Sequence, residues 1–278
     1  MTRYAMVIDV TRCDGCYNCF IVCKDEYCNQ EKKGYSAAQP MTGQDWMKII
    51  PVERGQFPKV KQDYIATPCM QCEAATCMNG EGDAVYKRDD GIVIIDPKKA
   101  VGQKQIVKAC PYGVIFWNEE KKLPQKCTLC AHRIDEGKVP RCVQACPSGC
   151  LVFGDFDDPE SEVSQLLASG KTEVFHPEWK TKPNIYYVHL EKATRNFIGG
   201  AIAYKDTDEC AEGAQVVLKG PKGRTLRTKA NAFGNFDFDG LLPGAYSVSI
   251  EAAGYKPQVI DIDLKTDKYL GVINLVKV

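Results

Sequence analysis

Alternating hydrophobic and polar positions dominate the last third of the chain. In NFDFDG (235–240) phenylalanines alternate with aspartates, and in QVIDIDL (258–264) isoleucine and leucine do the same. Period-two segments separated by Gly- and Pro-rich turns are typical of a small antiparallel sandwich or barrel. The pattern predicts an all-β domain over 195–278. Its seven expected strands are 197–204, 214–219, 225–230, 235–240, 245–252, 258–264 and 271–276.

Residues 1–194 have a different pattern, with loop-rich sequence and few regular elements. Apolar segments at Tyr4–Asp9, Gly91–Asp96 and Ile185–Leu190 predict short strands. One amphipathic helix is expected to follow Asp158, which is a favourable N-cap residue. The contrast between the two parts predicts two domains and an α+β fold class.

Charge and hydropathy narrow the possible partners. The chain of 278 residues has 36 Lys+Arg and 36 Asp+Glu, so its formal net charge is zero. A general nucleic-acid-binding protein would carry a basic excess, so no nucleic acid is expected. No apolar run approaches the ~20 residues of a membrane-spanning helix, and the N-terminus lacks a signal-peptide pattern. These features predict a cytoplasmic protein with no membrane anchor in this chain.

Cysteine is concentrated at one end, because 14 of the 15 cysteines lie in the first 150 residues. At this density a reducing compartment favours metal ligands over disulfides. The first motif is Cys13-x2-Cys16-x2-Cys19-x3-Cys23. In bacterial two-cluster ferredoxins, three thiolates at this spacing coordinate one iron–sulfur cube and the fourth coordinates the other. Structural zinc usually uses two separated pairs, so iron–sulfur is favoured.

Three further motifs follow along the chain. The second has three cysteines, the third retains only its last, and the fourth has four. Taken alone, the fourth also fits a zinc pattern. Their cysteines are, in order, Cys69, Cys72 and Cys77; Cys110; and Cys127, Cys130, Cys142 and Cys146. The ligand positions without a cysteine are Glu81, Ala100, Gln103 and Ile106.

The ferredoxin pattern assigns these cysteines to clusters, because the last cysteine of each motif serves the cluster of its partner motif. Motif one is paired with four, and two with three. All four positions without a cysteine then fall in a single set, cluster D, and three 4Fe-4S clusters are predicted. Cys28, Cys150 and Cys210 are left as bystander thiols. The three complete sets are Cys13, Cys16, Cys19 and Cys146 (cluster A); Cys127, Cys130, Cys142 and Cys23 (cluster B); and Cys69, Cys72, Cys77 and Cys110 (cluster C).

Several segments resemble the electron-transfer subunits of the dimethyl sulfoxide reductase family of molybdopterin enzymes. They are YAMVIDVTRCDGCYNC at the start, the four cysteine motifs, CPSGCLVFGDFDDPESEVSQLL and TKPNIYY, and they span roughly residues 1–190. The resemblance implies two ferredoxin-like units and a heterodimer with a large catalytic subunit. That subunit would carry molybdenum or tungsten on two pterin guanine dinucleotides, with molybdenum expected.

Two departures from this family stand out. Its members commonly keep four clusters, and they rarely end in a separate β domain. Here the β domain resembles transthyretin-like or carboxypeptidase-regulatory sandwiches. No nucleophile–base pair or paired carboxylates stand out, so no catalytic residue is expected in this chain. A cation near a cluster cysteine would favour the reduced cluster and raise its potential, but each of those present is expected to be an ordinary solvated side chain; they are Lys24, Lys108, Lys126 and Arg141.

Three functions remain open at this point. The chain is expected to be an electron-transfer subunit of an enzyme whose overall reaction has no net redox change. The resemblance makes cluster D the outermost cluster, the one that faces an external redox partner. Its ligands are missing here, so continuous exchange of electrons with such a partner is not expected. A second possibility is the small subunit of another reductase or dehydrogenase of the family. A third is a structural adaptor whose clusters only stabilise the fold, as metal binding does in small domains.

Overall fold

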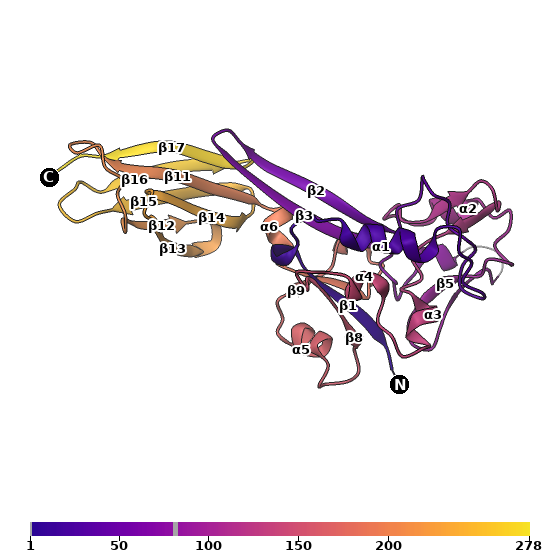
Figure 1. The fold of residues 1–278 in the computed structure, drawn as a ribbon. Coiled ribbons are helices and arrows are strands. Elements are labelled where there is room, and N and C mark those ends of the chain that lie inside the picture. Colours follow the sequence, from indigo (N-terminus) through magenta and orange to yellow (C-terminus); the bar gives the residue numbers. More distant parts are fainter. Residues whose placement is uncertain (1, 80–82) are drawn as a thin grey trace. The chain divides into compact units, whose positions relative to one another are not determined.

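The computed structural model describes residues 2–79 and 83–278 (Figure 1). The chain forms two compact units. Unit 1 comprises the residues up to Pro51 together with Asp63–Leu190, and unit 2 comprises Val52–Gln62 and Glu191–Val278. The second unit therefore begins close to the predicted boundary at residue 194. However, it also includes an internal segment that the sequence had assigned to the first domain.

A four-stranded sheet with the order β8-β1-β10-β9 organises unit 1. Strand β1 (Tyr4–Asp9) pairs antiparallel with β8 (Leu151–Asp155) and parallel with β10 (Ile185–Val188). Strand β9 (Thr172–Glu173) completes the sheet beside β10. The four central residues of β1 are all buried, which explains why its sequence is a continuous apolar run.

Helix α5 (Glu162–Ala168) packs on this sheet through the fully buried Val163. It begins later than the sequence predicted. Its N-cap is Ser161, whose hydroxyl accepts a hydrogen bond from the Ser164 N–H at 3.1 Å. Asp158 instead lies in the turn before the helix. Both residue types cap helices well, so composition alone could not choose between them.

The remaining elements of unit 1 are short and surround the cysteine motifs. They comprise α1 (Asn18–Tyr27), α2 (Gln105–Lys108), α3 (Ala131–Ile134), α4 (Arg141–Gln144), the pair β4 (Val85–Lys87) and β5 (Val93–Ile95), the pair β6 (Phe116–Asn118) and β7 (Leu123–Gln125), and the 3-10 turns Val10–Arg12, Thr76–Met78 and Pro177–Trp179.

Unit 2 is a sandwich of two sheets with the orders β14-β11-β17 and β13-β12-β15-β16. All seven predicted strands are present, within a few residues of their expected bounds. The pairing is antiparallel with one exception, since β11 and β17 run parallel. The elements are α6 (Glu191–Thr194), β11 (Asn196–Tyr204), β12 (Gln215–Lys219), the 3-10 turn Pro221–Gly223, β13 (Thr225–Lys229), β14 (Asn235–Leu241), β15 (Gly244–Glu251), β16 (Gln258–Leu264) and β17 (Lys268–Leu275).

The alternation in these strands separates core from surface as the sequence predicts. Phe236 and Phe238 of β14 are buried in the sandwich core together with Val248 and Ile250 of β15. Asp237 and Asp239, which alternate with these phenylalanines, point the other way. They do not face water alone, because both bind the internal segment of unit 2.

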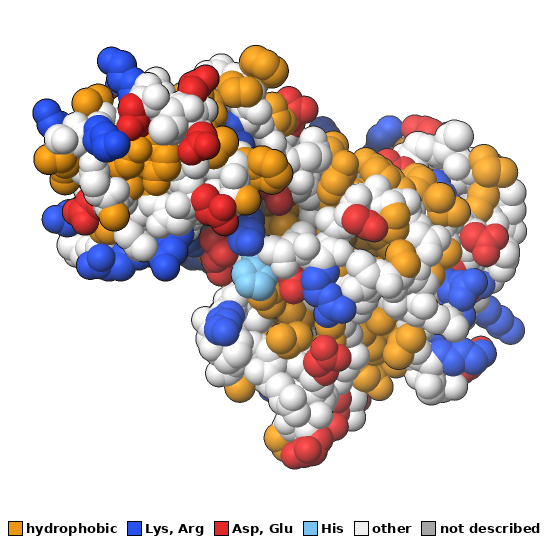
Figure 2. Space-filling view, turned by 60° about the vertical axis from the view of Figure 1, so that its left-hand side comes forward, with side chains coloured by type: hydrophobic (Ala, Val, Ile, Leu, Met, Phe, Trp, Pro, Cys, Tyr) orange, Lys and Arg blue, Asp and Glu red, His pale blue; other side chains and the backbone are white. Residues whose placement is uncertain are grey.

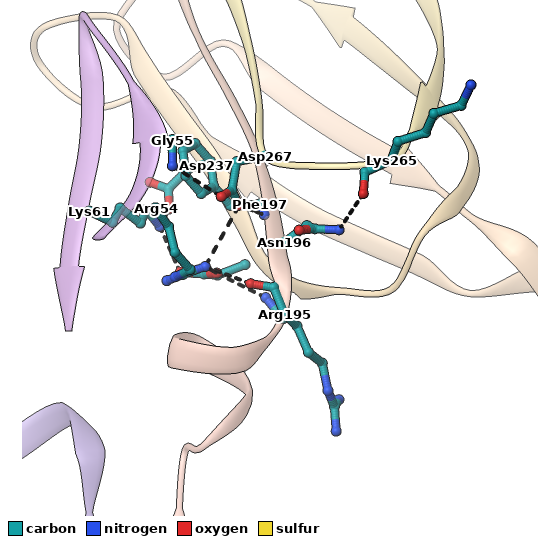
Figure 3. A network of polar contacts seen from close by, with 11 residues as sticks. Arg54, Gly55, Lys61, Arg195, Asn196, Phe197, Asp237, Lys265 and Asp267 are labelled. Atoms are coloured by element: carbon teal, nitrogen blue, oxygen red, sulfur yellow. Dashed lines mark hydrogen bonds and ion pairs between the residues drawn. The ribbon is translucent and has the colours of Figure 1, made fainter. Parts of the chain in front are cut away.

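That segment is the outer half of a long hairpin formed by β2 (Met47–Gln56) and β3 (Lys59–Pro68). Arg54 Nη1 donates to Asp239 Oδ1 at 3.0 Å. It also donates to the Arg195 carbonyl at 2.7 Å (Figure 3). Lys61 Nζ donates to Asp239 Oδ2 at 2.7 Å and to Asp237 Oδ2 at 2.5 Å. We call these five residues the Arg54–Asp239 network.

Surface charge and hydropathy agree with the balanced composition. The face drawn in Figure 2 carries basic and acidic side chains interspersed with one another. Within the described part of the chain, no helix is both long enough and apolar enough to cross a membrane.

Candidate iron–sulfur centres

The loop after β1 carries the first cysteine motif. Asp9 caps the 3-10 turn Val10–Arg12, and this turn ends at Cys13. Gly15 has φ +69°, and a Cβ at this position would lie only 2.5 Å from Cζ of Tyr64. Glycine alone combines that backbone conformation with so close an approach. Close packing against Tyr64 of β3 therefore fixes the conformation of this loop.

Helix α1 presents Cys19 and Cys23 one turn apart, and both are buried. At the start of the helix, Asn18 Nδ2 donates to the carbonyl of Ala145 at 2.5 Å. Ala145 directly precedes Cys146, the last cysteine of motif four. Protein contacts thus bring motif one next to motif four, as the predicted cluster A requires.

The four cysteines predicted for cluster A lie close enough for their charges to interact. Burial raises the pKa of Cys19 to about 12, and thiolate charges at Cys13, Cys146 and Cys16 act in the same direction. A thiol surrounded by three others favours a bound cation.

The cluster B cysteines form a second group. Burial raises the pKa of Cys23 well above its ordinary value, followed by the charges of Cys127, Cys130 and Cys142. Their site is largely shielded from water, since Cys130 and Cys142 are also buried. Such thiols hold their protons at neutral pH, and ligation of a metal would release them.

The cluster C cysteines form a third group around Cys72. Burial and the neighbouring Cys69 raise the pKa of Cys72 to about 12, and Cys110 and Cys77 act in the same direction. The Thr181 hydroxyl opposes them through a hydrogen bond to the Cys72 thiol.

The donor chemistry of all three groups fits iron–sulfur clusters. Each group offers four thiols and no histidine. In a 4Fe-4S cluster each of four cysteines binds a different iron, so four neighbouring thiols are the donor set that such a cluster uses.

The positions predicted for the missing cluster D lie in ordinary packed structure. Ala100 and Ile106 are buried in one hydrophobic core with Val93, Ile95 and Ile115. Gln103 is half-buried and donates to the carbonyl of Lys99 at 2.8 Å. Glu81, the fourth position, lies outside the described residues. A hydrophobic core thus occupies the place of at least two ligands.

Cys150, predicted to be a bystander, contacts two of the predicted cluster A cysteines. Its Sγ lies 3.5 Å from Cys146 Sγ. A hydrogen bond from Cys150 lowers the pKa of Cys13 to about 6, although burial acts in the opposite direction. Spacing within the motifs gave no signal of this contact. Of the other two bystanders, Cys28 is half-buried and Cys210 is exposed.

Lys126 also departs from its expected role. Predicted to be solvated, it is only 2% exposed. Its Nζ donates to the carbonyls of Val93 and Cys127, the latter at 3.2 Å. Of the remaining cations near cysteines, Lys108 is exposed, whereas Lys24 and Arg141 are half-buried.

Comparison with known proteins places both units in described families. Residues 60–156 match the 4Fe-4S dicluster domain, and residues 198–275 match the carboxypeptidase regulatory-like domain. The pyrogallol hydroxytransferase small subunit of Pelobacter acidigallici is 41% identical over 99% of this chain and 100% of that protein. A putative iron-sulfur subunit of a dimethyl sulfoxide reductase from Halobacterium salinarum is 34% identical over 69% of this chain and 80% of that protein. One subunit of the tetrathionate reductase of Salmonella typhimurium is 35% identical over 69% and 74%, respectively.

The chain belongs to the iron–sulfur, electron-transfer subunits of the dimethyl sulfoxide reductase family of molybdopterin enzymes. Within that family it is similar to the pyrogallol hydroxytransferase small subunit over nearly its whole length, β unit included. The predicted fold class and family are confirmed.

Proposed function

We propose that this chain is the electron-transfer subunit of a molybdenum hydroxytransferase that converts 1,2,3-trihydroxybenzene into 1,3,5-trihydroxybenzene. The observation that carries the proposal is the full-length similarity to the pyrogallol hydroxytransferase small subunit, since the two reductase subunits match only 69% of the chain. The chemistry belongs to a large partner subunit that carries molybdopterin guanine dinucleotide. This chain contributes no catalytic residue.

Its own cofactors are three 4Fe-4S clusters with the ligand sets A, B and C. The thiol groups around Cys19, Cys23 and Cys72 support these sets, because each cysteine interacts with the other three predicted members of its own set. When bound, the clusters supply one-electron storage and transfer. The protein holds them in sites that exclude water to different degrees, with cluster B the most enclosed. All twelve ligands lie in the predicted iron–sulfur domain, residues 1–194.

The lost cluster D supports a reaction without net redox change. Ala100 and Ile106 fill their positions with hydrophobic core, so the chain of clusters ends at C. An electron-transfer chain that lacks its outermost cluster is poorly suited to continuous export of electrons. It suits an enzyme that moves a hydroxyl group between aromatic rings, where the clusters set the redox state of the molybdenum site.

Iron analysis and turnover of the purified heterodimer test this proposal. We expect about twelve irons per small subunit and many turnovers without an external electron donor or acceptor. Cys16 and Cys210 provide a matched pair, since both thiols are exposed. Cys16→Ser should lower the iron content, whereas Cys210→Ser should leave it unchanged. Sixteen irons, or product formed only in proportion to an added oxidant or reductant, would contradict the proposal.

The similarity to two reductase subunits favours a second candidate, the small subunit of a reductase with an external redox partner. Strict dependence of turnover on such a partner would select it. A third candidate, in which the clusters only stabilise the fold, requires that no cluster changes oxidation state during turnover. Rapid-freeze electron paramagnetic resonance (EPR) during turnover distinguishes this candidate from the other two.

A further inference from the structure

We propose that the buried ammonium group of Lys126 is an electrostatic bridge between clusters B and C that favours an electron on cluster C. The inference rests on the proposed ligand sets. It goes beyond them by giving a redox-tuning role to a side chain that binds no iron.

Two buried polar side chains form the bridge. Lys126 Nζ donates to the carbonyls of Val93 and Cys127. Gln71, which is 1% exposed, donates through Nε2 to the same Cys127 carbonyl at 3.1 Å. Its Oε1 accepts a hydrogen bond from the Val93 N–H at 2.9 Å. Both side chains therefore bind the same two residues, which fixes the position of the ammonium group.

This bridge connects two clusters through the chain itself. Gln71 lies between Cys69 and Cys72, two ligands of cluster C, and Cys127 is a ligand of cluster B. Lys126 Nζ lies within hydrogen-bonding reach of the Cys69 thiol, a ligand of cluster C. Its contact with cluster B is indirect, because it bonds the backbone carbonyl of Cys127 rather than the thiol.

The charge of Lys126 has no carboxylate to balance it. Within the described part of the chain, no Asp or Glu forms an ion pair with this side chain. An isolated buried ammonium is costly unless its donors are satisfied. Here the carbonyls of Val93 and Cys127 accept hydrogen bonds from Lys126 Nζ. The thiolate ligands of the clusters would supply the balancing negative charge.

A fixed positive charge favours the more negative state of a neighbouring cluster. A one-electron transfer from cluster B to cluster C would oxidise B and reduce C, and no bond would form or break. Because Lys126 lies within reach of Cys69, a residue that would hold cluster C, its charge would stabilise the negative charge gained there. At any given solution potential, Lys126 therefore raises the ratio of reduced to oxidised cluster C, and it raises that of cluster B less.

Redox titration of the purified heterodimer, followed by EPR, tests the bridge. Lys126→Gln removes the charge but keeps a hydrogen-bond donor. We expect it to lower the reduced-to-oxidised ratio of cluster C at least tenfold at fixed potential, which is about 59 mV for one electron. Lys126→Arg should restore most of the ratio, and cluster A should not change. Lys108→Met is the matched control, because Lys108 is exposed and also lies near a cluster C ligand, Cys110.

Iron content distinguishes a failure of the proposed ligand sets from a failure of the Lys126 bridge. A heterodimer without about twelve irons would show that the ligand sets, and with them the proposed function, are wrong. Full iron content in Lys126→Gln with a cluster C ratio changed less than twofold would overturn the bridge alone. If this variant loses iron, Gln71→Glu decides, because it places a carboxylate beside the ammonium group and should also lower the reduced-to-oxidised ratio of cluster C. A ratio changed less than twofold in Gln71→Glu with full iron content would overturn the proposal.

Discussion

Replacing Arg54 by methionine should loosen the attachment of the hairpin tip to unit 2 by a predictable amount. The substitution keeps the apolar stem and removes the charge, together with the hydrogen bonds to Asp239 and to the Arg195 carbonyl. The Arg54 side chain is 8% exposed and that of Asp239 is 19% exposed. The network is thus mostly, but not completely, shielded from water.

The free energy that Arg54→Met removes from this attachment should lie between two known limits. Exposed ion pairs contribute about 0.2–1 kcal/mol, and breaking a fully buried pair costs about 3–5 kcal/mol. Asp239 retains Lys61 as a partner at 2.7 Å, so the upper limit does not apply. We expect a loss of about 2 kcal/mol. Since each 1.4 kcal/mol corresponds to a factor of ten, local opening should become about thirtyfold more frequent.

Amide hydrogen exchange on the intact chain measures this opening directly. Peptides from β14 and from the tip of the β2–β3 hairpin should exchange about thirtyfold faster in Arg54→Met. The control is Lys265→Met, because the pair between Lys265 and Asp263 is exposed and 3.5 Å long. Its exchange should stay within a factor of two. A change below threefold in Arg54→Met, or equal changes in both variants, would refute the reasoning.

The effect should also depend on pH in a defined direction. Burial acts to raise the pKa of Asp239, but hydrogen bonds from Arg54 and Lys61 outweigh it and lower the pKa. A lowered carboxyl pKa stabilises the fold fully above the unfolded value of about 3.9, and the contribution is lost as pH falls through the folded pKa. The difference between wild type and Arg54→Met should therefore be constant near neutral pH and shrink below about pH 4.

Three further outcomes follow from other parts of the structure. Ile106→Ala should lower the free energy of unfolding by about 3 kcal/mol and speed amide exchange in β5 about a hundredfold. A small effect would mean that the cluster D position is not packed core. Gly15→Ala should deplete the iron of cluster A because of the clash with Tyr64, whereas Gly113→Ala, at φ +63° with no neighbour within 4 Å, should retain full iron. Deleting 191–278 should leave all irons in place, because no predicted ligand lies there; spectroscopic loss of any cluster from the purified truncated protein would count against this.

The strands of unit 2 could be predicted because their alternation matches a two-layer core. Phe236 and Phe238 face inward, and the alternating Asp237 and Asp239 face away from the core. The β2–β3 hairpin gave no such signal. Its first strand contains Pro51 and Gly55, which are both depleted in strands, and its outer half is ordered by ion pairs to residues far along the sequence.

Part of the candidate site could likewise be predicted from the sequence, and part could not. Motif spacing and the ferredoxin crossover rule predict three ligand sets, and the thiols around Cys19, Cys23 and Cys72 lie close enough for their charges to interact. The roles of Cys150 and Lys126 could not be predicted, because they depend on which segments pack beside them. A lysine before a cysteine is usually solvated. Here the backbone of Val93, in another strand, accepts its hydrogen bond and removes it from water.

The position of β1 in its sheet imposes an order on biosynthesis. Its two neighbours, β8 and β10, lie about 140 to 180 residues further along the chain. At roughly 5–20 residues per second, the ribosome needs about ten to thirty-five seconds to supply them. During that interval an almost wholly apolar strand has emerged with both edges unpaired, which is the form most prone to pair with other chains. Strand β1 must therefore be shielded from other chains until the last strand of unit 1 has been made.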